Sequence, residues 1–169
     1  MVLGILADTQ IPFTPCQMMA LKKAFKGVQL ILHAGPLGNL KILDQLSNIA
    51  PTQAVCGNAE NSIIRSELFI RQSWTLGKVK LGLIHGYGKP QNLKSWLIKQ
   101  FENNPVQIIV YGRNFEPTAK QLGSIYFFSP GSFLGNLPEG QHGRRGPSRV
   151  GLLFIHGTKV DGIPGIVLS

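Results

Sequence analysis

Polar residues that could ligate a metal ion or hold a phosphate follow several apolar runs of this chain. Asp8 ends the first run, Asn58 follows a run that ends at Cys56, and His85 follows a run that ends at Ile84. Apolar runs of this kind indicate strands buried on both faces. Ligands of open α/β sheets bind just past the carboxyl ends of the strands. These residues are therefore expected where a metal or phosphate site would lie.

The first third of the chain alternates strands and helices, which would position these residues. After the strand that ends at Asp8, the pattern predicts a helix over 16–26, a strand over 28–32, a helix over 40–46 and a strand over 52–56. Strands that alternate with helices imply right-handed crossovers and a parallel sheet.

The rest of the chain is richer in strands. We expect short strands over the ranges 67–70, 73–76, 78–84, 106–110, 124–128, 150–156 and 159–168. A helix is predicted over 93–102, with Leu93, Trp96, Leu97 and Phe101 on one face for core packing. Residues 134–148 are rich in Gly and Pro, as in a long loop. No internal repeat or linker divides the chain, so residues 1–169 are expected to form one domain.

The composition is basic, with 17 Lys and Arg against 8 Asp and Glu, a formal charge of +9. This balance favours an anionic partner, although a basic surface that is simply solvated explains it as well. Cys16 and Cys56 lack the spacing of a metal site and are expected to be free thiols in a reducing cytoplasm. No run is long and apolar enough for a membrane span, so we expect no membrane partner.

The order of the polar loops resembles that of the calcineurin-like metallophosphoesterases. Within that superfamily, the chain is most similar to the small bacterial phosphodiesterases and to the related scaffold subunit of retromer. The family pattern is D-x-H, G-D, G-N, H-G-H, G-H-x-H and N-P-G-S. The corresponding residues here are Asp8-Thr9-Gln10, Gly35-Pro36, Gly57-Asn58, His85-Gly86-Tyr87, Gly112-Arg113-Asn114-Phe115 and Ser129-Pro130-Gly131-Ser132. The resemblance covers nearly the whole chain and implies a four-layer α-β-β-α sandwich with the site at one rim.

The resemblance also implies a site for two metal ions that activate a bridging water and hold the phosphoryl oxygens. Carried over position by position, the first metal would be held by Asp8, Gln10 and Phe115, and the second by Asn58, His85 and Arg113. Pro36 stands where the carboxylate shared by both metals belongs. Only Asp8, Asn58 and His85 therefore match the family, and His33 lies at a position that the family does not use as a ligand.

The four departures argue against a paired-metal hydrolase. Pro36 and Phe115 offer no side-chain ligand atom, Arg113 stays protonated, and Gln10 replaces an imidazole poorly. We therefore expect no cofactor, or at most one divalent ion such as Mn²⁺, Zn²⁺ or Mg²⁺ on Asp8, Asn58 and His85. For His85 the alternative is a neutral histidine hydrogen-bonded beside a glycine turn.

Arg113 suggests how a pocket without its metals could be neutralised. A carboxylate left at a former metal site is costly unless it is paired. One hypothesis is that Arg113 approaches Asp8 or Glu60, and the alternative is a surface loop residue. If the pairing forms, Arg113, His85 and the backbone amides of glycine-rich loops could still bind a phosphate without hydrolysing it.

Three functions remain open from the sequence. The first is an inactive or nearly inactive family member that binds an anion or serves as a scaffold for a protein partner. The second is a phosphodiesterase with a reduced one-metal site, in which His85 and Asn58 would be catalytic. The third is a nucleic-acid-binding module that uses its basic surface, including the loop residues His142, Arg144, Arg145 and Arg149. Whether the protein is an enzyme and whether it forms homo-oligomers stay open.

Overall fold

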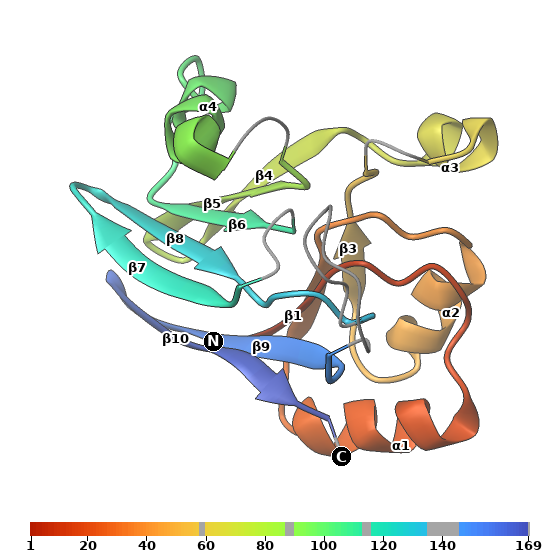
Figure 1. Cartoon of the computed structure of the whole chain (residues 1–169). Helices are drawn as coiled ribbons and strands as arrows, with labels where there is room; N and C mark the ends of the chain where they lie inside the picture. The colour runs from red at the N-terminus through yellow and green to blue at the C-terminus, as the bar shows by residue number, and fades with distance from the viewer. Residues whose placement is uncertain (58–59, 87–89, 113–115, 135–145, 169) are drawn as a thin grey trace.

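The structure, a computed structural model, describes residues 1–57, 60–86, 90–112, 116–134 and 146–168. Two five-stranded sheets lie face to face, with helices on their outer sides (Figure 1). The strand orders are β10-β9-β1-β2-β3 and β4-β5-β6-β8-β7. The four-layer α-β-β-α sandwich expected from the sequence is thus confirmed.

The first sheet has a parallel centre and an antiparallel edge. Its parallel strands are β1 (Val2–Leu6), β2 (Leu30–His33) and β3 (Thr52–Ala54). Helices α1 (Pro15–Ala24) and α2 (Lys41–Ser47) make the two crossovers. The antiparallel edge is formed by β9 (Arg149–His156) and β10 (Lys159–Val167).

The second sheet also carries parallel strands at its centre. Strands β5 (Val79–Ile84), β6 (Ile108–Tyr111) and β8 (Ile125–Ser129) are parallel. Strands β4 (Arg71–Leu76) and β7 (Thr118–Leu122) close the two edges in antiparallel pairing. The 3₁₀-helix η1 (Pro90–Asn92) and helix α4 (Leu93–Gln100) connect β5 to β6, and α3 (Ser62–Glu67) joins the two sheets.

Two parts of the sequence-based assignment were wrong. The strand expected over 67–70 does not form, because α3 occupies Ser62–Glu67 and β4 begins only at Arg71. The side chain of Asn61 starts this helix by accepting a hydrogen bond of 3.0 Å from the Ile64 N–H. Strand β7 was not predicted, since its residues are mostly polar and exposed, and it forms by pairing with β8. Most of the expected loop 134–148 lies outside the described residues.

Aromatic rings fill the spaces that glycines leave in both sheets. A Cβ atom at Gly151 or Gly162 would lie 2.6 or 2.5 Å from the ring of Phe128, which belongs to the core cluster between the sheets. A Cβ at Gly82 would lie 2.6 Å from the ring of Phe101. Leu93, Leu97 and Phe101 are buried and Trp96 packs against them, which confirms the predicted core face of this helix. Packing of this kind fixes the strand ends that carry the candidate site.

Candidate functional site

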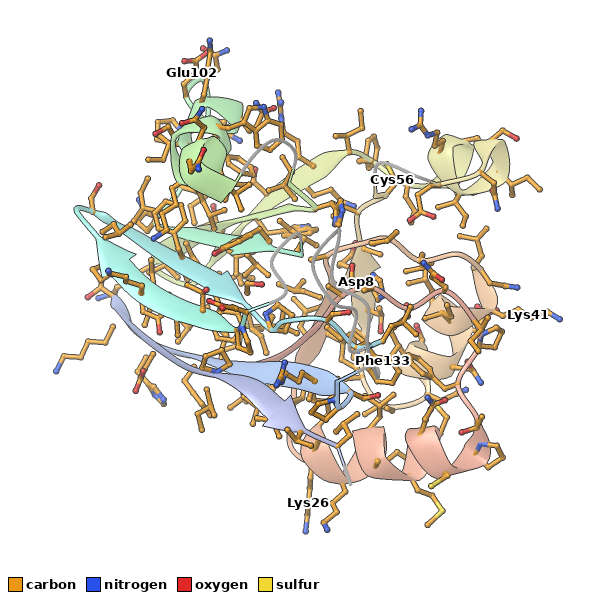
Figure 2. The ribbon with its side chains drawn as sticks, in the orientation of Figure 1. Asp8, Lys26, Lys41, Cys56, Glu102 and Phe133 are labelled. Carbon is orange, nitrogen blue, oxygen red and sulfur yellow. The ribbon has the colours of Figure 1, made fainter. Side chains whose placement is uncertain are left out.

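The polar strand-end residues predicted from the sequence gather at one rim. Asp8 follows β1, His33 ends β2 and His85 follows β5. Backbone hydrogen bonds of 3.0 Å join these loops, from the Asp8 N–H to the Gly35 carbonyl and from the Gly112 N–H to the His85 carbonyl. Figure 2 labels Asp8 at this rim, where strands of both sheets end. The sheet edge that the sequence pointed to is therefore a connected set of loops.

Asp8 is held in an unusual backbone conformation. Its φ angle is 61°, which makes it the one non-glycine residue with a positive φ among the residues that the structure describes. Its side chain is only 8% exposed. Left-handed conformations cost energy for residues other than glycine, and they cluster at functional sites. The loop after β1 thus stores backbone strain at Asp8, the first candidate ligand in the sequence.

Pro36 lies between the loop of Asp8 and the loop after β3. Its carbonyl accepts a hydrogen bond of 3.0 Å from the Thr9 N–H. A Cβ atom on Gly57 would lie 2.7 Å from the Cβ of Pro36, so the backbone after β3 packs directly on the pyrrolidine ring. The Gly35–Pro36 peptide bond is cis. Pro36, whose side chain offers no ligand atom, therefore lies against both the loop after β1 and the loop after β3.

His33 is the most deeply buried polar residue of the rim. It has no exposed surface, and burial, followed by the charge that His85 can carry, lowers its pKa to about 3. The Gly35 N–H donates to Nδ1 at 3.1 Å, so the neutral ring carries its proton on Nε2. Nε2 then donates to Thr9 Oγ1 at 2.6 Å. The ring fastens the loop after β1 to the loop after β2.

His85 is oriented by a different hydrogen bond. Its Nδ1 lies 3.0 Å from the carbonyl oxygen of Ala34, which can only accept, so Nδ1 carries a proton. The neutral ring then keeps its lone pair on Nε2. A backbone carbonyl commonly fixes a metal-binding histidine in this tautomer. His85 is therefore chemically suited to ligate through Nε2, and it is 7% exposed.

Glu60 is engaged with the backbone of two rim loops. Its Oε1 accepts hydrogen bonds from the Leu37 N–H at 2.5 Å and the Gly57 N–H at 3.1 Å. Its Oε2 accepts from the Gly38 N–H at 3.3 Å. The sequence suggested Glu60 as a partner for Arg113 and gave no sign of this role. The one signal in the sequence was the presence of a glutamate at this position, in a chain with only 8 Asp and Glu residues.

Several predicted site residues cannot be placed. Asn58, Arg113 and Phe115 lie outside the described residues, so the proposed contact of Arg113 with Asp8 or Glu60 stays a prediction. Gln10 is described and exposed, and its backbone packs against Gly38, where a Cβ would lie 2.3 Å from the Gln10 carbonyl oxygen. The loops are thus in close contact around residues that do not match the family's metal ligands.

The described residues of the rim do not form a cluster of metal ligands. Among the residues that the structure describes, no three His, Cys, Asp or Glu side chains are grouped so that they could hold one ion. Asp8 and His85 are suitable donors, whereas the ring of Pro36 offers no lone pair. Asn58 would have to complete even a single-metal site.

A family model and individual relatives assign this chain to the same protein family. A family model described as the calcineurin-like phosphoesterase superfamily domain matches residues 1–145. A probable metallophosphoesterase of Methanothermobacter thermautotrophicus is 31% identical over 137 residues, which are 78% of this chain and 77% of the relative. The phosphodiesterase YfcE of Escherichia coli K12 is 30% identical, over 73% of this chain and 67% of its own.

Solved structures share the fold at lower sequence identity. Vps29 of Entamoeba histolytica in complex with Zn²⁺ has a TM-score of 0.71 and 22% identity, covering 95% of this chain and 89% of that chain. An archaeal phosphodiesterase has a TM-score of 0.70 and 20% identity, covering 96% and 99%. Within the described part of this chain, no helix combines the length and apolar character needed to cross a bilayer.

Proposed function

Because the chain belongs to the calcineurin-like phosphoesterase superfamily, we propose that it is a member which has lost the dinuclear metal centre and acts by binding. It would hydrolyse phosphate esters poorly or not at all. Its rim would hold an anionic group, and its surface would serve a protein partner. The proposal treats residues 1–169 as a single domain, because the core between the sheets draws Leu3 and Ile5 from one sheet and Leu81 and Val110 from the other.

The position of Pro36 carries the proposal. A dinuclear centre needs a ligand that bridges the two ions, and carboxylates serve this purpose. The pyrrolidine ring of Pro36 lies against Gly57 and its carbonyl is bound to Thr9, so the loop cannot easily turn another group into that place. Two ions without a bridge would repel each other at short range. Loss of the bridging ligand therefore favours loss of the pair.

His85 supports the anion-binding part of the proposal. The bond to the Ala34 carbonyl places a proton on Nδ1 and orients the ring at the rim, where a donor group can meet an anion. The net charge of +9 adds a favourable long-range field for anions. A phosphate ester that binds here without two metals would meet no activated water.

An exposed apolar segment supports a protein partner. Ile63 of α3 is 65% exposed, and Phe69 and Ile70, which precede β4, are each 71% exposed. Large exposed apolar side chains close together in the chain are typical of interaction sites. The basic net charge disfavours a second copy of this chain as the partner, so we infer a protein segment with apolar and acidic residues.

A one-metal phosphodiesterase is the second candidate. The Nδ1–H bond of His85 favours it, because this bond presents Nε2 as a ligand, and Asp8 is the matching carboxylate. Relatives named as phosphodiesterases at 30% identity support it as well. Asn58 would be the third ligand. A cytoplasmic location stays a prediction.

The decisive experiment measures metal and turnover in the natural chain and in a restored one. The restored variant carries Gln10→His, Pro36→Asp, Arg113→His and Phe115→His together. Metal content is measured after dialysis with Mn²⁺, and hydrolysis of bis-para-nitrophenyl phosphate is followed with Mn²⁺ present. We expect less than one ion per natural chain with negligible turnover, and two ions with measurable turnover in the restored variant.

The same variant with Asp8→Asn added is the matched control, because it keeps the four restored residues and removes one carboxylate. It should lose both metal and turnover. Two ions per natural chain, with turnover that Asp8→Asn abolishes, would disprove the proposal even if the restored variant did not fold. One ion per natural chain with Asp8-dependent turnover would favour the second candidate instead.

A further inference from the structure

A groove with both polar and apolar walls opens at the end of the molecule opposite the rim. Its volume is about 350 Å³. The turns β4–β5, β7–β8 and β9–β10 gather at this end, on the left in Figure 1. Lys78, Val79 and Gln107 line the groove at the amino ends of β5 and β6, whereas the rim lies at their carboxyl ends. The groove is therefore separate from the candidate site.

The Tyr126 hydroxyl is the polar group of this groove whose role the fold does not explain. It lines the groove and is only 8% exposed. Its hydroxyl makes no hydrogen bond to any other residue that the structure describes, although no described side-chain polar atom is sealed off without a partner. The hydroxyl therefore faces the groove. A tyrosine hydroxyl at the wall of a groove can exchange a hydrogen bond with solvent for one with a ligand.

Most polar groups of the groove can donate a hydrogen bond, whereas Gln121, whose NH₂ group donates to the Gly123 carbonyl at 2.8 Å, offers an acceptor. Lys78 contributes an ammonium group and Thr158 a hydroxyl. The Oε1 atom of Gln107 already accepts from the Lys80 N–H at 2.6 Å, so its NH₂ group remains as a donor. Burial, and then the charge of Asp161, raise the pKa of Tyr126, which keeps its hydroxyl protonated at neutral pH. A ligand rich in acceptors matches these donors.

The charge and the size of the groove limit which ligands could bind there. Among the described residues that line the groove, Lys78 alone has a cationic side chain, and the carboxylate of Asp161 lies close enough to act on Tyr126. Lys78 attracts a negative charge at its end of the groove, and Asp161 disfavours a ligand that carries more than one. Val79 and Val160 supply apolar walls, and a volume at the lower end of the range for ligand sites fits a small molecule.

We propose that this groove binds a small organic monocarboxylate, with the carboxylate at Lys78 and Tyr126 and the apolar body against Val79 and Val160. The site does not depend on the metal-binding capacity of the rim. It would stand even if the function proposed above failed.

Benzoate is the probe for this site, and amide NMR spectra of the whole chain are the measurement. We expect saturable shifts at the amides of Lys78, Tyr126 and Thr158, with a Kd on the order of 1 mM for a ligand of this size. Benzamide has the same shape without the charge, and inorganic phosphate carries more charge without the ring. Each should bind at least about tenfold more weakly.

Three variants separate this site from general attraction to a basic protein. Lys78→Met should weaken benzoate binding by about tenfold, and Tyr126→Phe by about fivefold. Lys26→Met removes the same charge just past α1, far from the groove, and should change Kd by less than about twofold. Because the Tyr126 hydroxyl makes no hydrogen bond to another described residue, Tyr126→Phe should leave the urea midpoint unchanged.

The proposal would be overturned by any of four results. The first is the absence of saturable shifts at these amides. The second is equal binding of benzamide and benzoate. The third is an equal loss of affinity in Lys26→Met and Lys78→Met. A lowered urea midpoint in Tyr126→Phe would show that the hydroxyl already has a partner, and would remove the observation on which the site rests.

Discussion

Glu60 fixes the backbone of Leu37 through a hydrogen bond of 2.5 Å from the Leu37 N–H to the Glu60 carboxylate. The same carboxylate accepts from Gly38 and Gly57, so one side chain joins the loop after β2 to the loop after β3. Bonds from backbone amides to a charged acceptor are stronger than bonds between neutral groups. Glu60 is thus a positioning residue of the rim.

Glu60→Gln should lower the free energy of unfolding by about 2 kcal/mol, because a neutral amide replaces the charged acceptor and turns one NH₂ group toward a backbone N–H. Urea denaturation measures the change. Glu67→Gln, on the exposed side of α3, makes the same chemical change and should stay within about 0.5 kcal/mol of the natural chain. Equal effects of the two substitutions would refute the role given to Glu60.

His33 should make stability depend on pH. Its pKa is about 3 in the folded protein and 6.5 in the reference state, so the unfolded chain binds a proton that the folded chain rejects. The contribution is present above pH 6.5 and is lost as the pH falls toward 3. The free energy of unfolding should fall by up to about 1.4 kcal/mol per pH unit in this window.

Comparison with a variant isolates the part of the pH dependence of stability that is due to His33. Urea denaturation of His33→Gln between about pH 7 and pH 5 should show a flatter dependence than the natural chain, whatever its absolute stability. His156→Gln, at an exposed histidine, is the matched control. An unchanged slope in His33→Gln would mean that this ring can be protonated in the folded protein.

The positive φ of Asp8 predicts an unusual order of substitutions. Asp8→Gly and Asp8→Ala both remove the carboxylate, but glycine adopts φ 61° without cost, whereas alanine does not. Asp8→Gly should therefore be the more stable variant by about 1 kcal/mol in urea denaturation. At the exposed helical residue Asp44 the order should reverse, because glycine disfavours helices. The same order at both positions would contradict the strained loop.

Gly82 and Phe101 should behave as a coupled pair. Gly82→Ala places a methyl group 2.6 Å from the Phe101 ring, so it should destabilise the natural chain by about 2 kcal/mol. In a Phe101→Leu background the same substitution should cost far less, because the ring is gone. Gly151→Ala, whose methyl group would meet Phe128, should cost as much in that background as in the natural chain. Additive effects for Gly82 and Phe101 would disprove the packing.

Much of the fold was predictable because buried parallel strands are continuous apolar runs. The first three strands, the helix that begins at Leu93 and the rim at the strand ends all follow from this pattern. Strand β7 could not be found in this way, since Thr118–Leu122 has a polar, exposed pattern and depends on its pairing with β8. Helix α3 was missed because six residues with one buried side chain, Ile64, show no clear period.

The sequence alone determined which atoms each loop can offer at the rim. Proline at 36 lacks a ligand atom in any fold, because ligand chemistry belongs to the residue type. Only the tertiary structure decided that His33 bonds to Thr9, that Glu60 accepts from Leu37, and that Tyr126 faces a groove. These contacts depend on which distant segments meet, and the packing of the two sheets sets that arrangement.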